Sequence, residues 1–90
     1  MSTDAKLTDK QLRLLRFIEQ FWHDYGYGPS FAEISDGLGV DTTTVHERCK
    51  RLLKASLLAA NWLRDPKSGT MVQQQRSIRL TEEGRKAIAV

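Results

Sequence analysis

The residues of this chain that are best suited to chemistry lie in one stretch, Asp41–Ala55, which reads DTTTVHERCKRLLKA. Its hydroxyl, carboxylate, ammonium and guanidinium groups can hydrogen-bond to the edges of DNA bases and hold phosphates. At about 100° per residue, a helix over this stretch places its apolar residues on one side and its polar residues on the other. The inner side comprises Val45, Cys49, Leu52 and Leu53. The outer side comprises Thr43, Thr44, Glu47, Lys50, Arg51 and Lys54.

The start of this helix is rich in side chains that can cap it. Asp41 and the three threonines that follow can each accept hydrogen bonds from the unpaired N–H groups of a first turn. Thr44 with Glu47 has the spacing of a capping box, although Thr42 or Thr43 could equally be the N-cap. A solvated, charged surface helix would show the same pattern, so this stretch alone leaves both interpretations open.

Two helices are expected before this one. Thr8 with Gln11 has the spacing of a capping box, and the helix that it begins ends at a Gly-Tyr-Gly-Pro break. The apolar face of that helix, expected in the core, comprises Leu14, Leu15, Ile18, Phe21, Trp22 and Tyr25. Ser30 with Glu33 begins a second, short helix, and Gly39 suits the left-handed turn after it. A short helix, a turn with a glycine and a polar helix form the helix-turn-helix pattern, whose second helix reads the major groove of DNA.

The segment after the polar helix predicts a β-hairpin. Residues 58–63 alternate as a strand does, and the loop of the hairpin is expected somewhere in Asp65–Gln75, with Gln73–Gln75 near its base. Residues 76–80 are the predicted returning strand, with Ile78 and Leu80 facing inward. Three helices followed by a hairpin predict a winged helix-turn-helix, a mainly α fold with a small β-hairpin as its wing.

The two ends of the chain complete this domain. Residues 81–88 could form a short closing helix, with acidic residues early and basic residues late as the helix dipole favours. Residues 1–6 are expected to be a disordered N-terminus, which leaves residues 7–90 as one winged-helix domain.

Composition and charge fit a small domain that binds a polyanion. Ninety residues leave little room for a second core, and 40% hydrophobic with 28% charged residues is ordinary for a globular protein. Residues 1–40 hold four basic and six acidic side chains, a net charge of −2. Residues 41–80 hold eight basic and three acidic side chains, a net charge of +5, and residues 81–90 hold two of each. The positive charge is thus concentrated around the polar helix and the hairpin, as expected of a nucleic-acid interface.

The wing and the second helix supply further candidate contacts. Lys67 in the predicted loop, flanked by Arg64 and Arg76, could reach phosphates or the minor groove, although ordinary solvation of a hairpin is the alternative. The helix end at Ser30 could present backbone N–H groups to another phosphate. The candidate DNA-binding residues are Ser30, Thr42, Thr43, Thr44, His46, Glu47, Arg48, Lys50, Arg51, Lys54, Arg64, Lys67 and Arg76.

Each side chain type in this set suggests its own contact. Glu47 could accept a hydrogen bond from a cytosine amino group, and Arg48 or Arg51 could contact guanine or a phosphate. The threonines could touch a thymine methyl group or the backbone. The lysines at positions 50, 54 and 67 would hold phosphates.

The order and spacing of residues from Leu7 to about Leu80 resemble the N-terminal DNA-binding domain of LexA, the bacterial SOS repressor. The matching segments are Leu7-Thr8, Gln11, Phe17-Ile18, Gly28–Phe31, Glu33-Ile34, Leu38-Gly39, Thr44–His46, Leu52, Leu57-Leu58 and Arg76–Leu80. The resemblance implies a winged helix-turn-helix that binds operator DNA, usually as a symmetric dimer. It also implies that the first turns of the polar helix contact bases. The LexA peptidase domain is not among these 90 residues, so we expect neither its self-cleavage nor its mode of dimerisation here.

The leading hypothesis is a sequence-specific, double-stranded DNA-binding transcriptional regulator, a LexA-like repressor domain without self-cleavage. The alternative is a winged-helix protein-interaction module, such as a phage or plasmid accessory factor, which would bind no duplex even at low salt. A homodimer could form through the terminal helix or through apolar residues of the hairpin, namely Trp62, Leu63, Met71 and Val72.

Other classes of function lack their sequence signals. Two histidines, one cysteine, no phosphate-cradling glycine loop and no nucleophile elbow indicate no enzyme, metal site or cofactor. The core is expected to be too small for a small-molecule pocket, and Cys49 is expected to be a buried thiol. With no apolar run long enough to span a bilayer and no signal peptide, we expect a cytoplasmic bacterial protein with no membrane partner, located at the nucleoid when bound to DNA.

Overall fold

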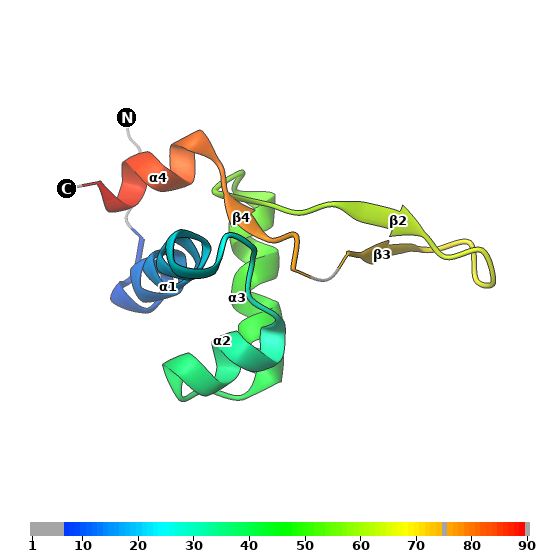
Figure 1. Ribbon diagram of the computed structural model, residues 1–90, viewed down its shortest axis with the longest axis horizontal. Helices are drawn as coiled ribbons and strands as arrows, with labels where there is room; N and C mark the ends of the chain where they lie inside the picture. The colour runs from blue at the N-terminus through cyan, green and yellow to red at the C-terminus, as the bar shows by residue number, and fades with distance from the viewer. Residues whose placement is uncertain (1–6, 75, 90) are drawn as a thin grey trace.

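The computed structural model describes residues 7–74 and 76–89 of the chain. Its elements are α1 (Asp9–Tyr25), α2 (Phe31–Leu38), α3 (Thr42–Lys54), β1 (Leu58–Ala59), β2 (Trp62–Arg64), β3 (Met71–Gln73), β4 (Arg79–Leu80) and α4 (Glu82–Ile88). The helices surround one core and the β2–β3 hairpin projects away from them (Figure 1). This arrangement confirms the predicted winged helix-turn-helix and its closing helix. The tail predicted for residues 1–6 lies outside the described residues.

Both predicted capping boxes are present. Thr8 Oγ1 accepts from the Gln11 N–H at 3.1 Å, and Gln11 Oε1 accepts from the Thr8 N–H at 3.0 Å. Ser30 and Glu33 make the same reciprocal pair at 3.1 and 2.8 Å. Gly39 ends α2 in the left-handed conformation with φ of 70°, as the turn requires. The Gly39 turn therefore ends α2 three residues before α3 begins at Thr42.

The α3 helix begins at Asp41, and the capping box expected at Thr44 and Glu47 is wrong. Asp41 is the N-cap, and its Oδ1 accepts from the Thr44 N–H at 2.8 Å. Hydrogen bonding by Thr44, with a smaller contribution from the charge of Arg48, holds the pKa of Asp41 below its ordinary value. A carboxylate is preferred here because it is a stronger acceptor than a hydroxyl and complements the positive end of the helix.

The core contains the inner stripe of α3 together with residues of α1, α2 and the strands. Its buried residues are Leu14, Leu15, Ile18, Ile34, Val45, Cys49, Leu52, Leu58, Ile78 and Leu80. Burial raises the pKa of the Cys49 thiol to about 12, which confirms the expected inert, buried thiol. Tyr25 is an exception to the prediction for α1, because 59% of it is exposed. It is the last residue of α1, and its ring packs at the surface against Phe21, with 4.5 Å between the ring centroids.

The wing is shorter than predicted and its strands pair differently. β2 pairs with β3 in antiparallel register, and β1 pairs separately with β4. The predicted returning strand over residues 76–80 therefore supplies only β4, which pairs with β1, whereas β3 forms within residues 65–75, the segment in which the loop is expected. Arg76 has a φ of 58°, which separates β3 from β4. Ile78 and Leu80 face the core as expected.

Candidate nucleic-acid interface

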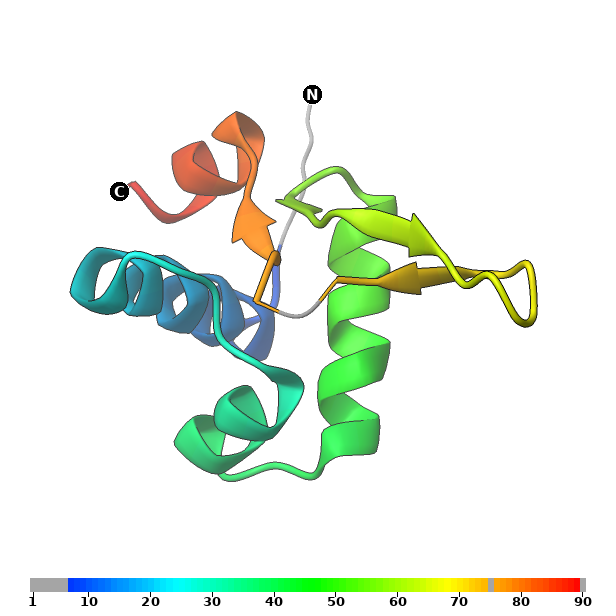
Figure 2. The ribbon, with the colours of Figure 1, turned by 45° about the vertical axis from the view of Figure 1, so that its right-hand side comes forward.

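The α3 helix presents a polar face to solvent along its whole length. Val45, Cys49 and Leu52 are anchored in the core, so the rotation of the helix about its axis is set by packing. The exposed residues are Thr42, Thr43, His46, Glu47, Lys50, Arg51 and Lys54, whereas Thr44 and Arg48 are half-buried. Figure 2 shows that α3 lies beside the wing, with the helix upright and the hairpin extending from its upper part.

Three cations are clustered on the later turns of this face. Lys50, Arg51 and Lys54, here called the basic patch, line one shallow hollow together with Glu47. Within residues 7–74 and 76–89, no carboxylate lies within ion-pair distance of any of the three. Their charges are therefore available to an external anion.

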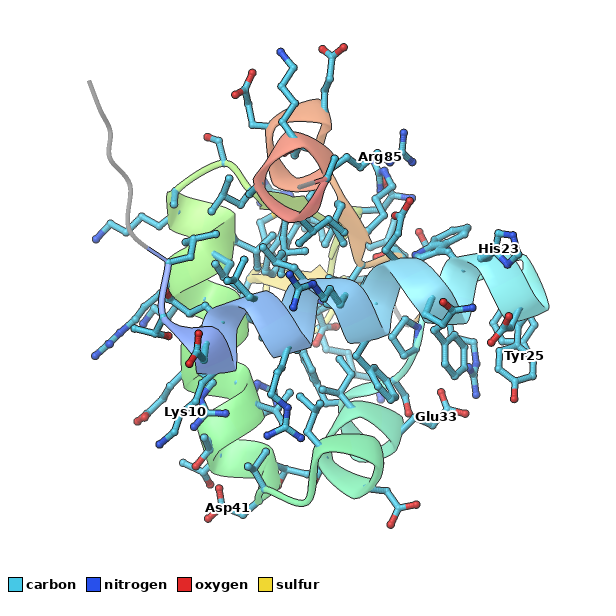
Figure 3. All side chains as sticks on the ribbon, turned by 90° about the vertical axis from the view of Figure 1, so that its left-hand side faces the viewer. Lys10, His23, Tyr25, Glu33, Asp41 and Arg85 are labelled. Carbon is cyan, nitrogen blue, oxygen red and sulfur yellow. The ribbon has the colours of Figure 1, made fainter. Side chains whose placement is uncertain are left out.

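The first turns of α3 carry hydrogen-bonding groups in place of cations. Thr42 and Thr43 follow the Asp41 N-cap at the lower end of the helix, where Figure 3 labels Asp41. The His46 ring packs on the Phe31 ring of α2, with 4.1 Å between centroids and 47° between planes. This contact orients the imidazole next to the start of α2, where Ser30 caps the helix.

The wing holds two of its three predicted basic residues at its outer part. Arg64 ends β2, and its Nη1 lies 3.4 Å from the Gly69 carbonyl oxygen of the turn. Lys67 is exposed in the turn, where its backbone N–H donates to Asp65 Oδ1 at 2.9 Å. The ammonium of Lys67 is not used in that hydrogen bond.

Arg76 differs from the other candidates because its guanidinium contacts the protein itself. Its two terminal nitrogens lie 2.8 and 3.1 Å from the carboxylate oxygens of Glu33, and one is 3.4 Å from the Gly28 carbonyl oxygen. The guanidinium also lies over the Tyr27 ring, 4.9 Å from its centroid. These contacts join the base of the wing to the start of α2. We therefore treat Arg76 as a residue that positions the wing and leave it out of the proposed interface.

The Glu33–Arg76 pair predicts a pH-dependent stability. The Arg76 hydrogen bond holds the pKa of Glu33 below its ordinary value. A carboxyl whose folded pKa is depressed stabilises the fold above its unfolded pKa and loses that contribution as pH falls through its folded pKa. Glu33→Gln keeps an acceptor for the Ser30 N–H but removes the charge. We expect its melting temperature to lie below that of the unmodified chain near pH 7 and the difference to shrink toward about pH 3. A difference that stays constant over this range would contradict the assignment.

Two surface hollows lie between the wing and the helices, where no sequence pattern signals them. One, of about 470 Å³, lies between α3 and the wing, and the other, of about 380 Å³, lies between the start of α2 and the base of the wing. Both hollows are open to the surface. The expectation that the core holds no sizeable pocket concerns the interior and does not apply to them. Sequence reasoning missed them because each is formed between the wing and a helix, and how the wing packs beside the helices is set by tertiary structure.

Comparison with known proteins decides the family. The sequence matches the model of the LexA DNA-binding domain over residues 4–60. The chain belongs to the LexA DNA-binding domain family. It is 38% identical over 82 residues to the LexA repressor of Oenococcus oeni, an alignment that covers 90% of this chain and 34% of that protein. It is 42% identical over 45 residues to the LexA repressor of a Roseiflexus species, an alignment that covers 50% of this chain and 21% of that protein. The LexA-like chain thus spans about a third, or less, of these curated relatives.

Solved structures show the same fold at low sequence identity. The DNA complex of MepR from S. aureus superposes with a TM-score of 0.64 and 21% identity over 91% of this chain and 53% of that one. Wild-type MarR from E. coli superposes with a TM-score of 0.61 and 19% sequence identity. This match covers 92% of this chain and 53% of MarR. These regulators support the winged-helix assignment of the LexA-like chain.

Two further features are missing from the described residues, a membrane-spanning helix and a cluster of metal ligands. In that part of the chain no helix combines the length and apolarity needed to cross a bilayer. Nor do three or more His, Cys, Asp or Glu side chains there come together in a way that could hold a metal ion.

Proposed function

We propose that this chain is a sequence-specific, double-stranded DNA-binding domain that regulates transcription, with α3 in the major groove and the wing over the adjacent minor groove. The observation that carries the proposal is the basic patch on the exposed face of α3, next to the wing, which has no ion-pair partner among residues 7–74 and 76–89. Membership of the LexA DNA-binding domain family supports it. In a bacterium, such a regulator would be located at the nucleoid while bound to its operator.

We use the exposure and charge of each candidate residue to assign it to a base contact or to a phosphate contact. The exposed Thr42, Thr43 and Glu47 on the first turns are assigned to base edges, with Glu47 accepting from a cytosine amino group. The half-buried Thr44 and Arg48 stand beside them and have less of their surface available. The basic patch, the Ser30 end of α2 and the wing residues Arg64 and Lys67 are assigned to phosphates.

We further propose that two copies bind a two-fold operator. A single helix in the major groove reads few base pairs, so regulators of this class place two half-sites about one helical turn apart. Leu63 and Val72, which are 54% and 45% exposed, supply apolar surface for contact between the copies. Sedimentation of the chain with a two-site duplex should show a 2:1 complex, and saturation at 1:1 would contradict the dimer.

Selection of bound sequences from a random duplex pool tests the DNA-binding proposal. We expect enrichment of a palindromic motif with half-sites about one helical turn apart. Glu47→Ala should relax the preference at one base position and cost about 1–3 kcal/mol for the selected site. If no motif is enriched and no duplex is retarded at low salt, the protein-interaction module becomes the better hypothesis.

A further inference from the structure

The two hollows beside the wing adjoin each other and are together called the trough. The first is lined by Phe31, His46, Glu47, Cys49, Lys50, Leu53, Trp62 and Gln73. The second is lined by Ser30, Phe31, Gln73 and Arg76, among others. Because Phe31 and Gln73 line both, the trough extends from Lys50 of the basic patch to the N-cap of α2. Residues of the wing line one side of it, and residues of α2 and α3 line the other.

The register of the wing decides which of its apolar residues face the trough. Trp62 pairs directly with Gln73, so their side chains lie on the same face of the hairpin, and both line the first hollow. Leu63 pairs with Val72, and this pair lies on the opposite face because neighbouring residues of a strand alternate. Trp62 is 47% exposed and lines the first hollow, so part of its side chain is available to a ligand there. The four exposed apolar residues of the wing therefore belong to two different surfaces.

We infer that the trough binds the sugar–phosphate backbone of one DNA strand, with a deoxyribose against Trp62 and the adjoining phosphate at Lys50. This inference rests on the proposed function. When α3 occupies the major groove and the wing occupies the adjacent minor groove, the strand that separates the two grooves must cross the space between α3 and the wing. The trough is that space.

The chemistry of the trough matches an alternation of apolar sugars and anionic phosphates. Phe31, Leu53 and Trp62 supply apolar surface, and Lys50 supplies positive charge that is continuous with the basic patch. Glu47 is the carboxylate in the first hollow, and it disfavours a phosphate at its own position. The phosphate is therefore assigned to the Lys50 ammonium, and the His46 ring, which packs on Phe31, can donate a hydrogen bond to the same strand. At the far end, the first turn of α2 directs backbone N–H groups outward from the Ser30 cap toward the next part of the strand.

The Trp62 contact and a phosphate contact should affect the salt dependence of DNA binding differently. An apolar side chain displaces water without releasing counterions, so its loss should weaken binding to every sequence while leaving the dependence on salt unchanged. Loss of Lys50, in contrast, should reduce the slope of log K against log salt by about 1. The two kinds of contact can therefore be told apart.

Two variants at exposed aromatic residues test the inference. Trp62→Ala removes the side chain that faces the trough, and Tyr25→Ala removes an exposed aromatic side chain at the end of α1, outside the proposed interface. With a labelled single half-site duplex, we expect about tenfold weaker binding for Trp62→Ala, for selected and unselected sequences alike and with an unchanged salt slope. Tyr25→Ala should stay within about twofold, because it changes exposed surface away from the DNA. Equal effects of the two variants would overturn the inference.

Fluorescence quenching gives a second readout that needs no loss of affinity. Trp22 is half-buried and its Nε1–H donates to the Ile78 carbonyl oxygen at 2.6 Å, whereas Trp62 is exposed. Saturating duplex should protect the unmodified chain from acrylamide quenching and should leave Trp62→Phe, in which only Trp22 emits, unchanged. Unprotected Trp62 in a saturated complex would overturn the inference while leaving the proposed function standing. Failure of the proposed function itself would appear as no binding by the unmodified chain.

Discussion

Replacing Lys50, Arg51 and Lys54 together by glutamine is expected to weaken DNA binding by about a hundredfold, which corresponds to roughly 1 kcal/mol for each lost phosphate contact. All three side chains are exposed, and within the described residues none is paired with a carboxylate. The same variant should reduce the slope of log K against log salt by about 3, since each contact releases close to one counterion. Binding isotherms at several salt concentrations measure both quantities.

A second triple variant controls for net charge. Arg16, Arg85 and Lys86 are exposed on α1 and α4, and Figure 3 labels Arg85 on the latter helix. Their replacement by glutamine removes the same three charges from surfaces outside the proposed interface. We expect this control to bind within about threefold of the unmodified chain, because these charges lie outside the proposed interface, salt screens exposed charges, and Arg85 and Lys86 already pair with Glu19 and Glu83. If both triple variants lose affinity equally, the overall charge and not the basic patch attracts the DNA.

Gly28→Ala is expected to be the most destabilising single change considered, by about 3 kcal/mol. A Cβ at this position would lie 2.6 Å from the Ile78 carbonyl oxygen and 2.9 Å from the Arg76 carbonyl oxygen. Both contacts are with backbone, which cannot rotate away as a flexible side chain does. The Gly28 N–H also donates to the Arg76 oxygen at 3.2 Å, and Trp22 donates to the Ile78 oxygen. The clash would therefore separate the start of α2 from the segment that enters β4.

Thermal unfolding followed by circular dichroism measures this effect. For a domain of this size we expect the melting temperature to fall by about 15 °C. Gly26→Ala is the matched control, because a Cβ there meets nothing within 4 Å but the residue has φ of 78°. It should cost only about 1–2 kcal/mol, the strain of a left-handed alanine. A Gly28→Ala chain as stable as the Gly26→Ala chain would show that the two carbonyl groups move aside at little cost.

The local features of this domain could be read from the sequence. The pairs Thr8 with Gln11 and Ser30 with Glu33 cap their helices across three residues, and Gly39 ends α2 within one turn. The apolar stripe of α3 depends only on the helical period, and its predicted burial at Val45, Cys49 and Leu52 is confirmed. These interactions are short-range, so the residues that make them are neighbours in the chain.

Competing local signals were resolved only in the folded chain. Asp41 and three threonines could all cap α3, and the position at which Val45 enters the core selects Asp41. Tyr25 continues the apolar face of α1, yet it lies at the end of the helix, beyond the core. In both cases the sequence pattern is compatible with more than one boundary, and packing against residues distant in the chain determines the boundary that forms.

Tertiary structure alone decided the strand pairing of the wing and the contacts of Arg76. Both Met71 and Val72 are exposed, so β3 has no alternating pattern that a sequence could reveal. Arg76 has the appearance of a DNA contact in the sequence, but the fold brings it to Glu33, 43 residues earlier. Trp62 and Leu63 are adjacent in the chain, but the pairing of β2 with β3 places their side chains on opposite faces of the wing. Helix starts and stripes are encoded by neighbouring residues, whereas strand pairing and long-range ion pairs depend on which distant segments the core brings together.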